Sequence, residues 1–199
     1  MIFSRILRPS LAAAALLAAM SVTAFSADLY KPAPAPVPVL GIPMPMMYEL
    51  RGGVFAHDPS SPEQGSVDIN GEFLVRLPIQ QTTVPDWLIP RPHIGFTANT
   101  AGKTSHAYVG VSWTYDITQK IFVEASFGGA VHNGYTGNVP KRGENSLGCS
   151  PLFRESGSLG YRLTEHWSVM ATVEHLSNAG ICKQNRGLTN VGGRVGYSF

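Results

Sequence analysis

Apolar and polar residues alternate with a period of two along eight stretches of this sequence. Between residues 105 and 116 one apolar face is formed by Ala107, Val109, Val111, Trp113 and Tyr115. Successive side chains of a β-strand point to opposite faces, so this repeat predicts strands rather than helices. The predicted strands cover residues 47–57, 66–77, 92–99, 105–116, 120–132, 152–162, 166–178 and 188–199.

Two properties of these stretches favour a barrel that crosses a membrane. Most reach the length of about nine to eleven residues that a tilted membrane-spanning strand needs. Their polar faces carry small and charged side chains, among them Gly110, Ser112, Arg154 and Arg194, as the interior of a narrow barrel would. We therefore expect an all-β fold, an eight-stranded antiparallel transmembrane β-barrel over residues 47–199. A soluble barrel or sandwich is the alternative.

The lengths of the connections predict how the barrel is oriented. The links near 117–119 and 163–165 are short, whereas 133–151 and 179–187 are long. In outer-membrane barrels the short turns lie on the periplasmic side and the long loops lie outside. This pattern fits a chain that enters its first strand from the periplasm. The segment 78–91 is the exception, because it is too long for a tight periplasmic turn.

The N-terminal residues have the pattern of an export signal. Residues 1–27 combine the basic residues Arg5 and Arg8 with a short apolar run and small residues at a predicted cleavage point. The apolar run is too short for a spanning helix. Residues 28–46 alternate proline with small apolar residues and predict a stiff, extended segment. We expect an exported protein that is integral to the outer membrane.

Charge and cysteine content exclude some classes of function. Without residues 1–27 the chain has 13 basic and 13 acidic residues, which argues against a nucleic-acid partner. The two cysteines, Cys149 and Cys182, fall in separate predicted loops, where they can form one disulfide bridge or remain unrelated thiols. The sequence has no ligand spacing typical of a metal site and predicts no cofactor. It leaves the oligomeric state open.

A histidine and a serine interrupt one of the apolar faces. His175 and Ser177 follow Val169, Ala171 and Val173 on the face that should contact lipid. Residues two apart on a strand have side chains about 7 Å apart, so an imidazole could reach the hydroxyl and take its proton. The alternative is a pair of polar residues at the membrane interface without any chemistry.

The sequence from Glu174 to Gly180, EHLSNAG, is followed by NRG at 185–187 and by a final strand. Together these segments resemble the lipid A 3-O-deacylase family, outer-membrane esterases of the PagL type. The resemblance implies His175 as the base and Ser177 as the nucleophile. It also implies an eight-stranded barrel with a lipid-facing site that acts on lipopolysaccharide without a cofactor. It further implies an oxyanion hole from Asn178, Ala179 and Gly180, with Asn185 and Gly187 as supporting loop residues.

One position departs from the family pattern. The family carries a glutamate twelve residues after the serine, but this chain has Thr189 there. The short turn near residue 164 sets Glu155 on the neighbouring strand either directly opposite His175 or one diagonal step away from it. We therefore hypothesise that Glu155 supplies the missing acid. Two rival functions stay open. One is a catalytically silent barrel that acts as a structural or adhesin-like protein, and the other is an acyltransferase.

Overall fold

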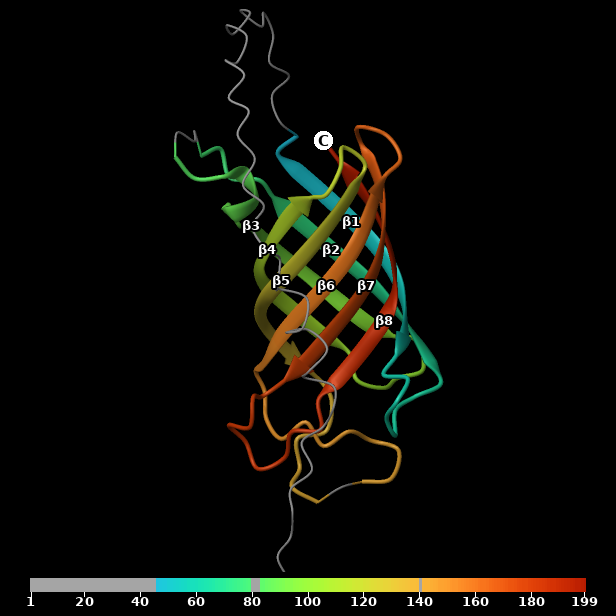
Figure 1. Cartoon of the computed structure of the whole chain (residues 1–199). Helices are drawn as coiled ribbons and strands as arrows, with labels where there is room; N and C mark the ends of the chain where they lie inside the picture. The colour runs from blue at the N-terminus through green and yellow to red at the C-terminus, as the bar shows by residue number, and fades with distance from the viewer. Residues whose placement is uncertain (1–45, 80–82, 140) are drawn as a thin grey trace, which may run out of the picture. The chain divides into compact units, whose positions relative to one another are not determined.

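The computed structural model describes residues 46–79, 83–139 and 141–199. The predicted signal peptide (1–27) and nearly all of the proline-rich segment (28–46) lie outside these residues. Eight strands form one closed antiparallel barrel in chain order, as the period-two pattern predicted (Figure 1). The strands are β1 Tyr48–His57, β2 Ser66–Val75, β3 Arg91–Asn99, β4 His106–Asp116, β5 Ile121–His132, β6 Leu152–Arg162, β7 Trp167–Ser177 and β8 Leu188–Ser198.

Pairing of the first and last strands closes the barrel, with a register that runs from Glu49↔Ser198 to Ala56↔Val191. One end of the barrel, here called the loop end, carries the loops 58–65, 100–105, 133–151 and 178–187 (Figure 1). Short turns join β4 to β5 and β6 to β7 at the opposite end.

The connection between β2 and β3, which the sequence predicted to be a short packed excursion with Trp87 at the interface, contains a short 3-10 helix, Asp86–Leu88. The indole of Trp87 contacts the ring of Tyr115 edge to face, with centroids 5.9 Å apart, so this connection packs against β4. None of the helices in the described part of the chain is long and apolar enough to cross a membrane.

The outer wall of the barrel is apolar. Leu50, Ile94 and Val109 are 57%, 60% and 62% exposed, and similar side chains recur on every strand. A continuous belt of exposed aliphatic and aromatic residues is costly in water and matches the lipid-facing surface of a membrane barrel.

The interior of the barrel is filled with paired charges. Arg51 forms salt bridges with Glu49 at 2.7 Å, with Glu72 at 3.0 Å and with Glu124 at 2.6 Å. Nearer the loop end, Arg154 contacts Glu174 at 2.7 Å. Buried charges are tolerated where each one has partners and hydrogen bonds. Because this network occupies the interior, a site that a substrate can reach has to lie on the outer wall or in the loops.

Candidate active site

His175 and Ser177 lie on the outer face of β7, close to the loop end. Their neighbours Glu174 and Leu176 point into the barrel and are buried, whereas His175 and Ser177 are half-buried. Strand parity therefore places both side chains on the lipid-facing wall, as the sequence predicted. Within the described residues no hydrogen bond joins Ser177 to His175. Such bonds are often long in free enzymes and shorten only when substrate binds.

The imidazole of His175 has its hydrogen-bond partner on β8. His175 Nδ1 lies 2.8 Å from Thr189 Oγ1, across the register pair His175↔Thr189. When Nδ1 donates its proton to this hydroxyl, the lone pair of Nε2 is free to accept a proton. A hydroxyl thus contacts the ring where the family resemblance leads us to expect a carboxylate. Thr189 can orient the ring but carries no charge.

Gly187 packs directly against the same imidazole. Its φ angle is +73°, and a Cβ at this position would lie 2.8 Å from His175 Cε1 and 3.1 Å from Leu176 O. Both the left-handed backbone and the close approach favour glycine over any larger residue. Gly187 therefore supports the site by leaving room for the histidine ring.

Glu155 lies on β6 in the register pair Glu155↔His175, directly opposite the histidine. Its side chain is exposed on the outer wall. Among the described residues it makes neither a hydrogen bond nor a salt bridge. Nδ1 of His175 contacts Thr189 on the other neighbouring strand. Glu155 is within cross-strand distance of the imidazole but does not contact it in this conformation.

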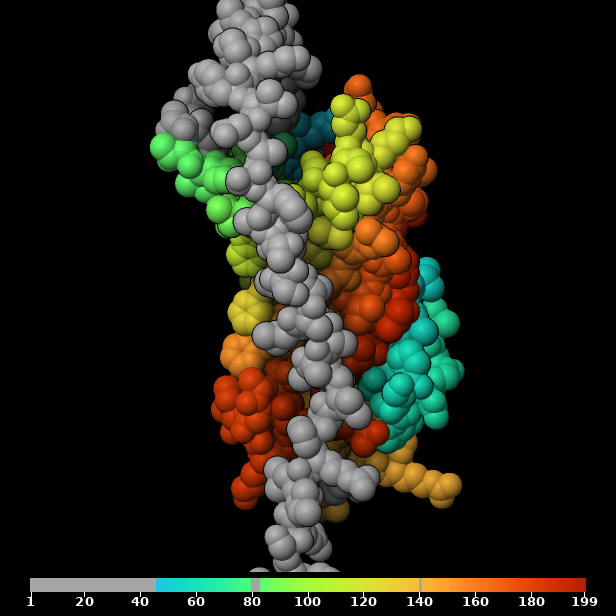
Figure 2. All heavy atoms as spheres, in the orientation of Figure 1, coloured from blue at the N-terminus to red at the C-terminus, as the bar shows by residue number. Residues whose placement is uncertain are grey.

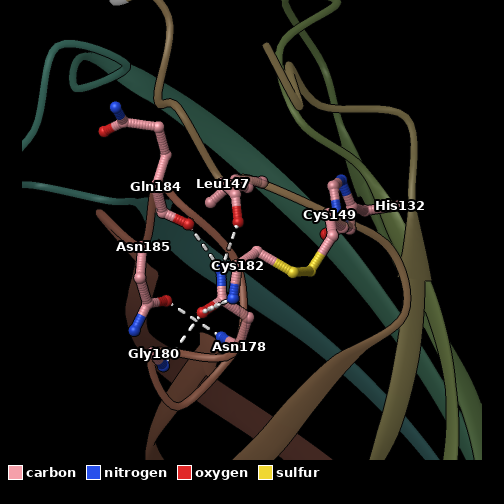
Figure 3. Close-up of a disulfide and its surroundings, with 8 residues drawn as sticks. All are labelled: His132, Leu147, Cys149, Asn178, Gly180, Cys182, Gln184 and Asn185. Atoms are coloured by element: carbon pink, nitrogen blue, oxygen red, sulfur yellow. Dashed lines mark hydrogen bonds between the residues drawn. A yellow bond between two sulfur atoms is a disulfide. The ribbon is translucent and has the colours of Figure 1, made fainter. Parts of the chain in front are cut away.

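Asn178 organises the turn that follows Ser177 (Figure 3). Its side-chain amide donates to Leu147 O at 2.8 Å and to Gln184 O at 2.6 Å, and its Oδ1 accepts the Gly180 amide at 2.9 Å. The backbone amide of Asn178 donates to Asn185 Oδ1, also at 2.9 Å. The side chain of Asn178 and the amide of Gly180 are thus engaged within the loop.

Ala179 differs from its two neighbours in the turn. Its φ angle is +53°, an uncommon conformation for a residue with a side chain. Its backbone amide makes no hydrogen bond to any part of the chain that the structure describes. Unusual backbone angles of this kind are found at functional sites that are held in place by their surroundings. Of the groups in the predicted oxyanion hole, the backbone amide of Ala179 is the one without a hydrogen-bond partner among the described residues.

A disulfide joins Cys149 to Cys182, with a Cα–Cα distance of 6.2 Å (Figure 3). It connects loop 133–151 to loop 178–187. The carbonyl of Cys149 accepts a hydrogen bond from His132 Nε2 at 2.9 Å, which anchors the bridge to the end of β5. The bridge restrains the segment that contains Ala179 and Gly187.

Glu63 connects further loops of the same end. Its carboxylate accepts hydrogen bonds from the backbone amides of Asn145 at 2.7 Å and Thr104 at 3.1 Å, and lies 3.1 Å from His57 Nε2. Burial raises the pKa of this carboxyl, but the hydrogen bonds with His57, Asn145 and Thr104 outweigh it and lower the pKa to about 2. The loop end is therefore a cross-linked assembly.

Asp58, the first residue after β1, is a residue of the site that the sequence did not predict. One carboxylate oxygen accepts the backbone amide of Thr189 at 3.1 Å. Figure 2 shows the β1–β2 loop, cyan to teal, beside the red β8 at this end of the barrel. Asp58 also lines a groove of about 410 Å³ together with Arg186, Gly187 and Thr189. No local sequence pattern marks an aspartate in a loop as part of a site formed 131 residues later.

Comparisons with known proteins agree with this architecture. The crystal structure of the outer membrane enzyme PagL aligns with a TM-score of 0.59 at 17% identity, over 76% of this chain and 99% of that one. The N-terminal β-barrel domain of Pseudomonas aeruginosa OprF aligns with a TM-score of 0.53 at 13% identity, over 77% and 98%. A de novo designed transmembrane β-barrel aligns with a TM-score of 0.51 at 12% identity, over 78% and 97%.

A search of curated proteins finds no match. The structural likenesses therefore show the fold, and a family model supplies the closer assignment. The model described as "Lipid A 3-O-deacylase (PagL)" matches residues 75–198. This segment covers more than half of the chain and includes β6, β7, β8 and the loop that carries the site. The chain belongs to the lipid A 3-O-deacylase (PagL) family.

Proposed function

We propose that this protein is a serine esterase that removes an ester-linked acyl chain, the one at the 3-O position, from the lipid A of lipopolysaccharide. The proposal rests above all on one observation. Ser177 and His175 share the lipid-facing wall of β7 close to the loop end, where a membrane-embedded ester could reach them. Family membership supports the choice of substrate.

In the first step Ser177 Oγ attacks the carbonyl carbon of the ester, and its proton passes to His175 Nε2. The tetrahedral intermediate collapses when the bond between this carbon and the sugar oxygen breaks. The sugar oxygen takes the proton from His175 and leaves as a hydroxyl. Ser177 then carries the acyl chain as an ester.

Water completes the cycle. His175 Nε2 takes a proton from water as its oxygen attacks the acyl-enzyme, and the proton returns to Ser177 Oγ as a free hydroxy fatty acid leaves. Thr189 keeps the imidazole oriented through both steps by its contact with Nδ1. No metal ion or organic cofactor takes part in this scheme.

For the oxyanion hole we propose the backbone amide of Ala179 as the principal donor, with Asn178 and Gly180 holding it in place. Asn178 links the turn to the neighbouring loop segments, and Asn185 fixes its amide. Donors that are already oriented stabilise the developing negative charge without reorganisation, and removing one typically costs about 10²–10³-fold in rate.

Glu155 is our proposed source of negative charge on the β6 side of the imidazole. A carboxylate on a lipid-facing wall is costly unless it lies near the interface or has a partner. We also propose that residues 1–27 are cleaved on export and that the mature barrel resides in the outer membrane, with the loop end outside. The site then faces the leaflet that contains lipopolysaccharide.

Mass spectrometry of lipid A tests this function. Purified protein folded in detergent is incubated with lipid A, beside Ser177→Ala and Glu155→Gln. We expect the wild type to remove one hydroxyacyl chain and release it as free acid, Ser177→Ala to be inactive and Glu155→Gln to be slowed. Appearance of the chain on an added alcohol acceptor would identify an acyltransferase. Intact lipid A in all samples, with barrels that are demonstrably folded, would favour the silent barrel.

A further inference from the structure

The contact between His175 and Thr189 leaves the catalytic histidine without a charged partner on β8. We propose that Asp58 supplies this charge as a positioning residue that acts through Thr189. The proposal rests on the function given above, because it concerns the environment of the same histidine. Asp58 lies outside residues 75–198, the segment that matches the family model.

Hydrogen bonds fix Asp58 next to Thr189. Its Oδ1 accepts the backbone amide of Thr189 at 3.1 Å, and its own amide donates to Asn190 Oδ1 at 3.1 Å. Its other carboxylate oxygen accepts a hydrogen bond from the side-chain amide of Asn145. Asn190 in turn donates to Glu174 in the barrel interior at 3.0 Å. Asp58 therefore joins the start of β8 to the end of β1 and sets the position of the threonine.

The charge on Asp58 is buried and has no cationic partner. The residue is 6% exposed, and it makes no salt bridge with a lysine, arginine or histidine in the described residues. Its hydrogen-bond donors, from Thr189 and Asn145, are neutral. A buried carboxylate with only neutral partners is costly to stability. The negative charge of Asp58 would stabilise a neighbouring group that becomes positive during turnover, such as an imidazolium.

The backbone of Asp58 is also unusual, since its φ angle is +36°. Aspartate adopts a positive φ in turns more readily than most residues, and Asp58 opens the turn that follows β1. The hydrogen bonds with Thr189 and Asn190 hold it in this conformation next to β8.

Other ionisable groups near His175 lie on different sides. Glu155 faces it from β6, and Arg186 lines the same groove as Asp58 and Thr189. Asp58 is the carboxylate on the β8 side, two strand spacings or roughly 10 Å from β7. At an effective dielectric constant of about 20, one charge at that distance changes the protonation equilibrium of an imidazole roughly tenfold.

The test is an NMR titration of the His175 ring in the full chain folded in detergent, with the signal assigned from His175→Gln. We expect Asp58→Asn to lower the titration midpoint of His175 by about one pH unit, which is the tenfold effect above. Glu63→Gln is the control for a loosened loop. It neutralises another buried carboxylate of the same loop, which also holds Asn145 but has no contact with Thr189.

A second readout is the rate at which a fluorophosphonate labels Ser177 near neutral pH. Labelling requires an activated serine but no glycolipid substrate. We expect Asp58→Asn to slow labelling roughly tenfold. Thr189→Glu places a carboxylate against Nδ1 of His175, so adding Asp58→Asn to that variant should slow labelling by less than it does in the wild type. A merely structural role for Asp58 would shift the midpoint equally in Glu63→Gln, and its effect on labelling would not be offset by Thr189→Glu.

The outcomes separate the two proposals. An unchanged midpoint in Asp58→Asn, or an equal shift in Glu63→Gln, overturns the role of Asp58. A shifted midpoint together with lipid A left intact by the wild type overturns the proposed function but keeps Asp58 as the group that tunes His175. A shifted midpoint together with deacylation of lipid A supports both proposals.

Discussion

Replacing Gly187 by alanine should inactivate the site while the barrel remains folded. Two costs follow from the structure. The φ angle of +73° disfavours an L-residue by roughly 1–2 kcal/mol. In addition, the new Cβ would lie 2.8 Å from His175 Cε1, which is 0.6 Å short of the 3.4 Å at which ordinary contact begins. The ring must therefore move by more than half an ångström or rotate away from Ser177.

A displacement of about 1 Å in a reacting group can cost on the order of 10²-fold in rate. We therefore expect lipid A deacylation by Gly187→Ala to fall by about that factor, measured by mass spectrometry of the remaining lipid A. Gly143→Ala is the matched control. Its φ angle is +80° in loop 133–151, but a Cβ there would meet no atom within 4 Å.

Gly143→Ala should thus share the backbone cost and keep the activity. Both variants should still migrate as folded barrels on unheated gels. Equal rates for Gly187→Ala and Gly143→Ala would refute the reasoning, because they would mean that the space beside His175 has no bearing on turnover.

Three further predictions concern the loops and the interior. Replacing both Cys149 and Cys182 by serine should cost at most about 4 kcal/mol, since the bridge closes a separation of 33 residues, and should lower turnover, as measured by urea unfolding and by lipid A hydrolysis. Arg51→Met removes the partner that Glu49, Glu72 and Glu124 share, while Arg91, Arg154 and Arg194 still contact these glutamates. Urea unfolding should therefore show a free-energy loss of at most about 3–5 kcal/mol. Folding lowers the pKa of Glu63 from 4.5 to about 2. The ionised carboxylate therefore stabilises the folded protein fully above pH ~4.5, and this stabilisation is lost as the pH falls towards 2. Proteolysis of the loops in the wild type should increase as the pH falls from 4.5 to 2. In Glu63→Gln it should already be high at neutral pH, and a cleavage rate equal to that of the wild type there would contradict this role of Glu63.

Much of the fold could be predicted from local pattern. A strand in a membrane barrel shows one face to lipid and the other to a packed interior, so each residue's parity reports its environment. This is why the bounds of β4 and β6 were predicted to within one residue and why His175 and Ser177 were assigned to the outer wall. A short turn also propagates register along a hairpin, which is why Glu155 was expected close to His175.

The sequence by itself determined the eight strands, the face on which the serine and histidine lie, and the resemblance to the deacylase family. Only the tertiary structure decided which groups surround the histidine. The choice of Thr189 as partner of Nδ1 depends on ring orientation, which parity does not encode. The approach of Asp58 depends on closure of β1 against β8, which brings together residues 131 positions apart. Local alternation fixes the direction of a side chain, whereas the contacts of loops are set by the closed barrel as a whole.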